Sequence, residues 1–299
     1  MANYTIINWC HMAKDMVYYI GRKTRTKAEK RRNMAFAFCS FASGSTGNSY
    51  LIKTDKTNIL VDAGISGKRI VAGLESKGIE PQDLDAVLIT HEHTDHIQSL
   101  RVMSKKAQQA ELFASAGTFA KIAGDLPAER TQRVLPGETF FIGDIVVKPF
   151  HLSHDAAEPT GFSFVNGGKQ ITIVTDTGYV TDEIYEQIRC ADLLVLEANH
   201  EVNILKMGTY PYNVKRRILG DYGHLSNEAA GECICRMLGD RKDRKMPKVI
   251  LAHLSRENNT PKQAYLTIKN ILLEEEFYIE KDLELDIITK DEISTLYEV

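Results

Sequence analysis

The segment His91-Glu92-His93-Thr94-Asp95-His96 directly follows the apolar run Val87-Leu88-Ile89. The run predicts a short buried strand, so these six residues lie at its carboxyl end, where α/β folds place their sites. Imidazole and carboxylate side chains together suit Zn(II), Mn(II) or Fe(II). A helical zinc-protease motif requires His at the fifth position, which is Asp95 here, so that class of site is excluded.

The cluster has the ligands for more than one ion. His91 and His93 point the same way on an extended chain, whereas Asp95 and His96 can turn toward a second ion. Because two ions need more than four ligands, other residues must contribute. Ligand types follow three further predicted strands: His154 after 145–151, Asp176 after 171–174 and His253 after 249–251. Each of the three alone also fits a solvated side chain, but together with the cluster they favour a metal centre.

Strands and helices alternate from Met34 to the C-terminus, without a repeat or a linker rich in Pro, Gly and Ser. This pattern predicts one layered α/β domain over residues 34–299. Strands are predicted at 36–41, 49–53, 57–62, 86–90, 111–115, 132–135, 138–142, 145–151, 160–165, 169–175, 192–197, 248–252 and 284–289. Helices are predicted at 66–78, 97–108, 180–189, 226–238 and 261–274.

Charge is unevenly distributed along the 299 residues. Residues 1–33 hold eight Lys or Arg and two Asp or Glu, a charge of +6, so a net charge of −3 leaves −9 on the rest. We expect 1–33 to be a basic N-terminal extension that is poorly ordered and dispensable; as an amphipathic segment it also fits contact with a membrane or nucleic acid. No run of 18 apolar residues exists, so no membrane span is expected.

The ligand pattern resembles the metallo-β-lactamase superfamily over about residues 35–290. Its motifs occur in order as His91-x-His93-x-Asp95-His96, His154, Asp176 and His253, with Asp62 at the end of an early strand. The resemblance implies an αββα four-layer sandwich, two β-sheets flanked by helices, with two divalent metal ions (Zn, Mn or Fe) at one edge. It implies that His91, His93 and His154 hold the first ion, that Asp95, His96 and His253 hold the second, and that Asp176 bridges both.

Two ions that share a water make a hydroxide near neutral pH, so hydrolysis is the expected reaction. Glu197 and His224 resemble a Glu–His pair that delivers a proton to the leaving oxygen in tRNA-maturation nucleases of this superfamily. They stand in Leu196-Glu197-Ala198-Asn199-His200 and Gly223-His224-Leu225-Ser226-Asn227. His224 also fits a helix-capping or core histidine. The expected catalytic residues are Asp95, Glu197 and His224.

Two further segments point to a phosphodiester substrate. Residues 206–217 interleave cations with aromatics, so Lys215 and Arg216 are expected to contact phosphates and Tyr210 and Tyr212 to stack on bases. A solvated helix face explains the same charges. The turn at 43–49 offers hydroxyls and backbone N–H groups for a terminal phosphate; the residues expected to bind there are Ser45, Thr46 and Asn48.

Motifs occur in order at residues 42–49, 91–96, 210–212, 223–227 and 253–259. Together they are similar to those of the WalJ (YycJ) family, and the similarity runs from Met34 nearly to the end. This resemblance implies a bacterial cytoplasmic 5′-to-3′ exonuclease on double-stranded DNA, and it places the family's start near Met34. Only 76 residues separate Asp176 from His253, too few for the inserted domain of RNA-processing relatives, and only 21 separate His154 from Asp176, too few for a tRNA-gripping arm.

The expected function is therefore a dinuclear metal-dependent phosphodiesterase, a 5′-to-3′ DNA exonuclease that uses a metal-bridging hydroxide. Hydrolysis of a small cyclic phosphodiester fits a compact domain equally, and a metal-bearing, non-catalytic regulator that binds DNA or a protein of the cell-wall stress pathway is a third alternative. With −9 on the body, DNA binding should be weak, independent of base sequence and steeply dependent on salt. The residues themselves leave open the native metal, DNA versus RNA, the polarity of the exonuclease and the oligomeric state.

Overall fold

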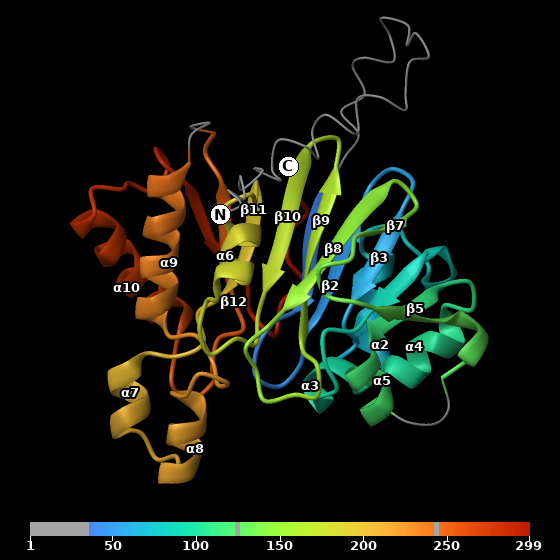
Figure 1. The fold of residues 1–299 in the computed structure, drawn as a ribbon, viewed down its shortest axis with the longest axis horizontal. Coiled ribbons are helices and arrows are strands. Elements are labelled where there is room, and N and C mark those ends of the chain that lie inside the picture. The colour runs from blue at the N-terminus through green and yellow to red at the C-terminus, as the bar shows by residue number, and fades with distance from the viewer. Residues whose placement is uncertain (1–35, 123–125, 242–244) are drawn as a thin grey trace, which may run out of the picture. The chain divides into compact units, whose positions relative to one another are not determined.

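Two mixed β-sheets of seven strands each stack face to face in the part of the chain that the computed structural model describes, residues 36–122, 126–241 and 245–299 (Figure 1). The extension expected at residues 1–33 lies outside these residues. The first sheet has the order β14-β1-β2-β3-β4-β5-β6 and the second β13-β12-β11-β10-β9-β8-β7. The first sheet comprises β1 (Ala37–Ala42), β2 (Ser49–Lys53), β3 (Asn58–Val61), β4 (Ala86–Leu88), β5 (Glu111–Ser115), β6 (Thr131–Val134) and β14 (Tyr297–Glu298). The second comprises β7 (Phe140–Ile142), β8 (Ile145–His151), β9 (Thr160–Asn166), β10 (Lys169–Val174), β11 (Leu193–Glu197), β12 (Lys248–Ala252) and β13 (Glu284–Ile287).

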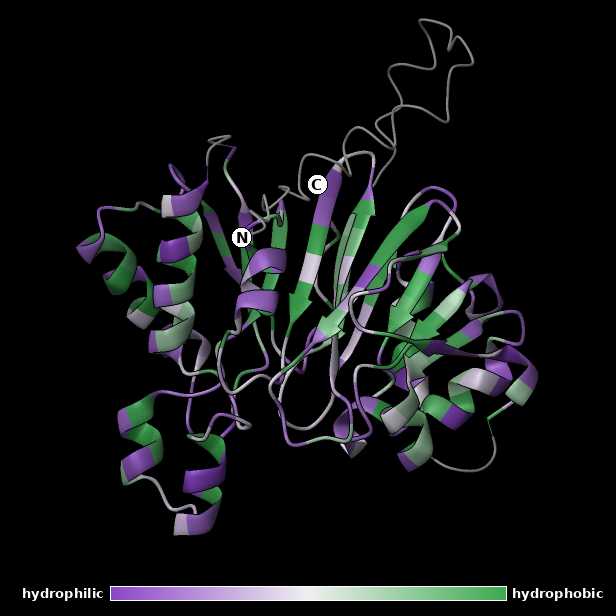
Figure 2. Ribbon diagram, viewed as in Figure 1, coloured by the Kyte–Doolittle hydropathy of each residue, from purple (hydrophilic) through white to green (hydrophobic). Residues whose placement is uncertain are grey.

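Apolar side chains from both sheets fill the space between them. Phe38 and Tyr50 of the first sheet lie in one buried cluster with Phe162 and Phe164 of the second. Figure 2 shows hydrophobic residues along much of β8 and β9. The strands are apolar because both of their faces are covered, which leaves few positions for polar residues.

Helices cover the outer face of each sheet. Ile70 of α2 (Gly67–Glu75), Met103 of α4 (Leu100–Lys106) and Ile122 of α5 (Ala116–Ile122) pack on the first sheet. On the second sheet the helices are α6 (Asp182–Ile188), α9 (Asn227–Asp240) and α10 (Pro261–Glu274). The order helix, sheet, sheet, helix confirms the predicted αββα sandwich. In the described residues, no helix is both long and apolar enough to cross a membrane.

The directions of the strands bring the carboxyl ends of many of them to one edge of the sandwich. Strands β3 and β4 are parallel, as are β10, β11 and β12. Because β8 and β10 are both antiparallel to β9, they too run in the same direction. The residues that follow these strands come from distant parts of the sequence, yet they gather at the carboxyl ends.

The helices differ from the sequence prediction at several points. The single helix expected at 97–108 is two, α3 (Thr94–Ile97) and α4, because Ser99 N donates to Ala63 O instead of continuing the helix. Helix α5, the pair α7 (Val202–Met207) and α8 (Tyr212–Ile218), and strand β14 were not predicted. Helices α7 and α8 each bury one residue, Leu205 and Ile218, so they carry no apolar periodicity for a sequence pattern to reveal.

Candidate metal centre

Two of the expected ligands and the motif residue Asp62 lie on strained backbone just after a strand. Asp62 follows β3, Asp176 is the second residue after β10, and His253 follows β12. Their φ angles are 60°, 60° and 55°. Residues other than glycine rarely adopt this left-handed conformation, and such strain concentrates at functional sites.

Three histidines form the first group of ligand atoms. His91, His93 and His154 each offer a ring nitrogen, and these atoms lie within 4.8 Å of one another. His91 Nδ1 is 3.0 Å from Thr90 Oγ1, and His154 Nδ1 donates to Gly223 O at 3.0 Å. Since Nδ1 is engaged in both rings, Nε2 remains to bind an ion.

Asp95, His96 and His253 form a second group within the same distance limit of 4.8 Å. His96 Nδ1 is 2.8 Å from Asp62 Oδ2, and His253 Nδ1 is 2.9 Å from Glu197 Oε1. Both rings are thus held from behind by a buried carboxylate, which fixes the ring orientation.

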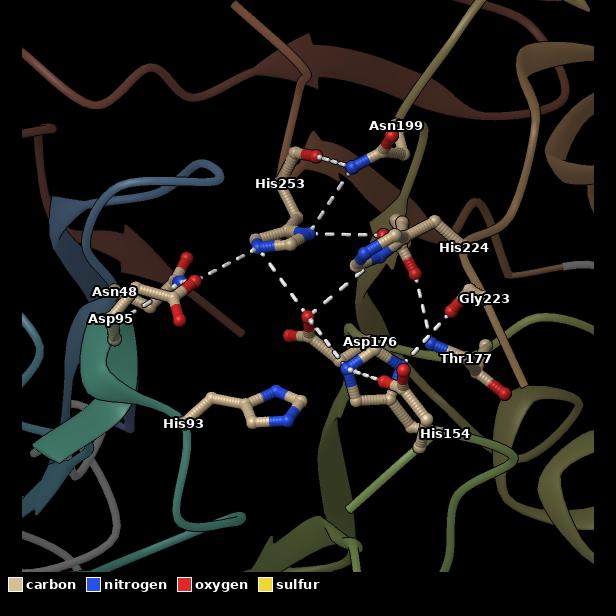
Figure 3. A network of polar contacts seen from close by, with 12 residues as sticks. Asn48, His93, Asp95, His154, Asp176, Thr177, Asn199, Gly223, His224 and His253 are labelled. Atoms are coloured by element: carbon tan, nitrogen blue, oxygen red, sulfur yellow. Dashed lines mark hydrogen bonds and ion pairs between the residues drawn. The ribbon is translucent and has the colours of Figure 1, made fainter. Parts of the chain in front are cut away.

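Asp176 lies between the two groups (Figure 3). Its carboxylate is 3.3 Å from His96 Nε2, 3.4 Å from His253 Nε2 and 3.8 Å from His154 Nε2. Asp176 Oδ2 and His253 Nε2 are buried and make no hydrogen bond within the described residues. Buried polar atoms are costly without a partner, and a divalent cation is the partner that carboxylate and imidazole share. The structure therefore brings all seven predicted ligands together in an arrangement that fits metal binding.

The pKa values of the buried histidines shift in opposite directions in the two groups of ligands. Burial lowers the pKa of His91 and of His154, which keeps both imidazoles neutral and able to bind a metal. Burial also opposes protonation of His253, but Asp176, Asp95 and Glu197 outweigh it and raise the pKa of His253 to about 10. The carboxylates thus create a negative potential at this half of the site, and that potential favours a cation.

Glu197 and His224 meet as the sequence predicts. Glu197 is the buried last residue of β11, and its Oε1 is 2.8 Å from His224 Nδ1, while Thr177 N donates to Oε2 at 2.9 Å. Burial raises the pKa of Glu197, but the hydrogen bonds and charges of His224 and His253 outweigh it and lower this pKa to about 2. Ser226, not His224, caps α9, so helix capping does not explain His224.

The turn residues expected to bind a terminal phosphate divide into two kinds. Ser45 and Thr46 are exposed. Asn48 is buried, and its Nδ2 lies 3.1 Å from His96 Nε2 and 3.5 Å from Asp95 Oδ2. Asn48 therefore contacts the ligands themselves.

The residues of segment 206–217 that are expected to contact DNA also differ in their surroundings. Tyr212 and Arg216 on α8 are exposed, and Tyr210 is half-buried. Lys215 Nζ donates to the carbonyl oxygens of Lys206 and Gly208 at 2.9 and 2.6 Å, which joins α8 to the end of α7. Two of its three donors are thus occupied.

Sequence reasoning missed two residues that orient the ligands. Thr90 Oγ1 lies 2.9 Å from Asp62 Oδ2 and 3.0 Å from His91 Nδ1, and Asn199 Nδ2 donates to the carbonyl oxygen of His253 at 3.0 Å. The only sequence signal for either is its position beside a motif. The contacts of Thr90 with Asp62 and of Asn199 with His253 span 28 and 54 positions of the chain, so spacing could not show them.

Comparison with known proteins gives the family of this chain. Residues 57–247 match the model of the family described as "Beta-lactamase superfamily domain". Exodeoxyribonuclease WalJ of Streptococcus pneumoniae is 38% identical over 271 residues, which cover 89% of this chain and 99% of that protein. The chain belongs to the WalJ/YycJ family of the beta-lactamase superfamily.

A second WalJ/YycJ relative, Exodeoxyribonuclease YycJ of Bacillus anthracis, is 37% identical over 84% of this chain and 95% of its own. The crystal structure of the metallo-beta-lactamase fold protein YhfI from Bacillus subtilis superposes with a TM-score of 0.65 at 16% identity, covering 89% of this chain and all of that one. That likeness establishes the fold. The WalJ/YycJ chain is thus a metallo-hydrolase, and its His and Asp groups imply divalent metal.

Proposed function

We propose that this protein is a DNA exonuclease that hydrolyses phosphodiester bonds in the 5′-to-3′ direction with two divalent metal ions. The observation that carries the proposal is the Glu197–His224 pair, which borders the cluster of seven ligands and places a proton donor beside it. The names of the WalJ and YycJ relatives support DNA as the substrate, and the resemblance stated above supports the direction. The same resemblance supports a cytoplasmic location.

We assign the ligands to two ions. His91, His93 and His154 would hold the first, the group of Asp95, His96 and His253 would hold the second, and Asp176 would contact both. When bound, Zn, Mn or Fe would supply a deprotonated water and would stabilise negative charge on the phosphate.

The protein's own residues manage the proton of the leaving group. The carboxylate of Glu197 holds His224 at Nδ1 and thereby orients the ring. Nε2 is then the nitrogen that donates a proton to the leaving oxygen as the phosphorus–oxygen bond breaks. Thr177 N and the second histidine, His253, keep Glu197 ionised in this position.

DNA contacts in this proposal are few and independent of base sequence. Arg216 and the remaining donor of Lys215 contact phosphates, and Tyr210 and Tyr212 stack on bases beside them. Ser45 and Thr46, both exposed at the turn after β1, receive the terminal 5′-phosphate. Because the body of the protein is acidic, we expect affinity to fall steeply with salt.

The test is release of nucleotides from a duplex labelled at either the 5′ or the 3′ terminus, with Mn(II) present. We expect early release of the 5′ label, loss of activity in EDTA, and loss in His93→Ala. Release from the 3′ terminus first would refute the direction, and release that survives both EDTA and His93→Ala would refute the metal mechanism. A cyclic phosphodiester assayed in parallel separates the small-substrate alternative: hydrolysis of that compound alone would replace DNA as the substrate.

A further inference from the structure

Arg217, the cation that follows Arg216 in α8, pairs with Asp155, the residue that follows the expected ligand His154. Its Nη2 donates to Asp155 Oδ1 at 2.7 Å, and its Nε donates to Asp155 Oδ2. Asp155 Oδ1 is in turn 3.5 Å from His154 Nε2, the nitrogen assigned to the first ion. A single carboxylate oxygen thus separates the guanidinium from a metal ligand.

The segment after Arg217 is fixed against the segment that bears His154. Ser153 Oγ donates to Asp221 O at 2.9 Å, and Asp155 N donates to Tyr222 O at 3.1 Å. The hydrogen bond from His154 Nδ1 to Gly223 O is the third link in this row. Three hydrogen bonds therefore fix the backbone that follows Arg217 against the segment that bears His154 and Asp155.

The guanidinium of Arg217 also has N–H groups that Asp155 does not occupy. Asp155 occupies the edge of the guanidinium formed by Nε and Nη2. The other edge, formed by Nη1 and Nη2, donates to no described residue. Arg217 and Asp155 are 47% and 36% exposed. Ion pairs this exposed contribute little to stability, so folding alone does not explain the pair.

We propose that Arg217 contacts the scissile phosphate through its Nη1–Nη2 edge, and that Asp155 is a positioning residue that holds the guanidinium in place. The inference rests on the phosphodiesterase activity proposed above and adds a residue to it. A planar guanidinium matches two phosphate oxygens at once, which a lysine ammonium does not. Among the three cations at the end of α8, Arg217 is the one whose described hydrogen bonds lead to the centre, through Asp155 beside His154, whereas Lys215 donates to carbonyl oxygens.

The first test compares Arg217→Ala and Arg217→Lys on two substrates, a 5′-phosphorylated duplex and bis(4-nitrophenyl) phosphate, which contains only a scissile phosphate. We expect Arg217→Ala to lower kcat about 100-fold on both, as loss of one preorganised donor does. Arg217→Lys should recover only part of the loss, and millimolar guanidinium should partly restore Arg217→Ala. A matched control is Arg189→Ala, since Arg189 pairs with Glu186 on the surface and lies at the end of α6 that leads away from the site.

The second test does not use turnover. It measures how the affinity of the metal-free protein for a fluorescent DNA duplex, in EDTA, depends on salt. In Arg217→Ala we expect the slope of log affinity against log salt to be smaller by about 0.9, which is the contribution of one phosphate contact. Metal content should be unchanged in Arg217→Ala and in Asp155→Asn. If Asp155 acts only through Arg217, Asp155→Asn should have no further effect on kcat in the Arg217→Ala background.

The outcomes separate the two proposals. Unchanged kcat and an unchanged salt slope in Arg217→Ala would overturn the role of Arg217, as would a loss that coincides with loss of metal and is not rescued by guanidinium. A loss on DNA with none on the small ester would place the contact away from the scissile phosphate and overturn the proposal as stated. If the wild-type protein hydrolyses the ester but not DNA, the proposed function fails, while the ester still tests Arg217. If the wild-type protein hydrolyses neither substrate, the proposed function fails, and the salt dependence of DNA binding in Arg217→Ala then decides whether Arg217 contacts a phosphate.

Discussion

Replacing Glu197 by Gln tests whether one carboxylate oxygen determines which ring nitrogen of His224 and His253 carries a proton. Glu197 Oε1 lies 2.8 Å from His224 Nδ1 and 2.9 Å from His253 Nδ1, and Thr177 N donates to Oε2. The amide of Glu197→Gln has the same shape, but only one of its two ends accepts hydrogen bonds. If its oxygen keeps Thr177, its NH2 group faces both rings and forces their protons onto Nε2. If the amide is reversed, the NH2 group opposes the N–H of Thr177.

Either orientation damages the centre in a way that can be estimated. A proton on Nε2 of His253 blocks metal binding there, and loss of a supporting carboxylate lowers metal affinity about 10- to 100-fold. A proton on Nε2 of His224 leaves that ring neutral, and a neutral imidazole is a much weaker acid than the imidazolium that the carboxylate of Glu197 stabilises. Loss of such a carboxylate partner lowers kcat by up to about 10⁴-fold, which corresponds to about 5.5 kcal/mol of transition-state stabilisation. We therefore expect kcat at saturating metal to fall about 10³- to 10⁴-fold in Glu197→Gln, with the fold retained.

The assay measures kcat on duplex DNA at saturating Mn(II), together with metal affinity by competition with a chelator. Glu201→Gln is the matched control, because Glu201 is also buried but its Oε2 accepts from Asn227 and Thr267, and no histidine of the described residues hydrogen-bonds to its carboxylate. We expect Glu201→Gln to change stability and leave kcat within a few-fold. A Glu197→Gln protein that binds metal normally and keeps its kcat within threefold would refute the reasoning.

Acid unfolding gives Glu197 a second, independent readout. Its folded-state pKa of about 2 lies below its usual value of 4.5. The ionised carboxylate therefore stabilises the fold above pH 4.5, and this contribution is lost as the pH falls toward 2. The Glu197→Gln variant lacks this contribution, so its free energy of unfolding should change less over that interval.

Four further predictions concern the supporting structure. Asp62→Asn should lower metal affinity about 10- to 100-fold by chelator competition, since Asn tolerates the left-handed conformation but is a weaker acceptor for His96; an unchanged affinity would contradict the orienting role. Phe162→Ala, in the core between the sheets, should lower the free energy of unfolding in urea by about 3–5 kcal/mol, and a loss below about 1 kcal/mol would be inconsistent with that packing. Deletion of residues 1–33 should leave metal content and turnover as in the full chain, and loss of either would give that segment a role. Tyr212→Ala should weaken binding of single-stranded DNA by about 1–3 kcal/mol in a fluorescence titration if a base stacks there, and unchanged affinity would exclude the contact.

Much of the fold could be predicted because its signals are local. Strands β2, β5, β8 and β12 begin and end where the sequence pattern places them, since each is a short apolar run bounded by polar residues. Helix α10 does so as well, because Thr260 and Pro261 mark its start by capping and by a fixed φ angle. Helices α7 and α8 escaped prediction because they bury too little to show a periodic pattern.

By itself, the sequence determined which side chains have metal-binding chemistry and that each follows a strand, because ligand type and the end of an apolar run are both properties of neighbouring residues. Only the tertiary structure decided which atom faces which. Glu197 meets His253 across 56 positions, Arg217 meets Asp155 across 62, and the backbone of His253 meets Ser43 across 210. Hydrogen bonds act over about 3 Å in space and carry no information about separation along the chain. Parallel strands in two packed sheets bring these distant residues to one edge, and their packing sets the distances on which catalysis depends.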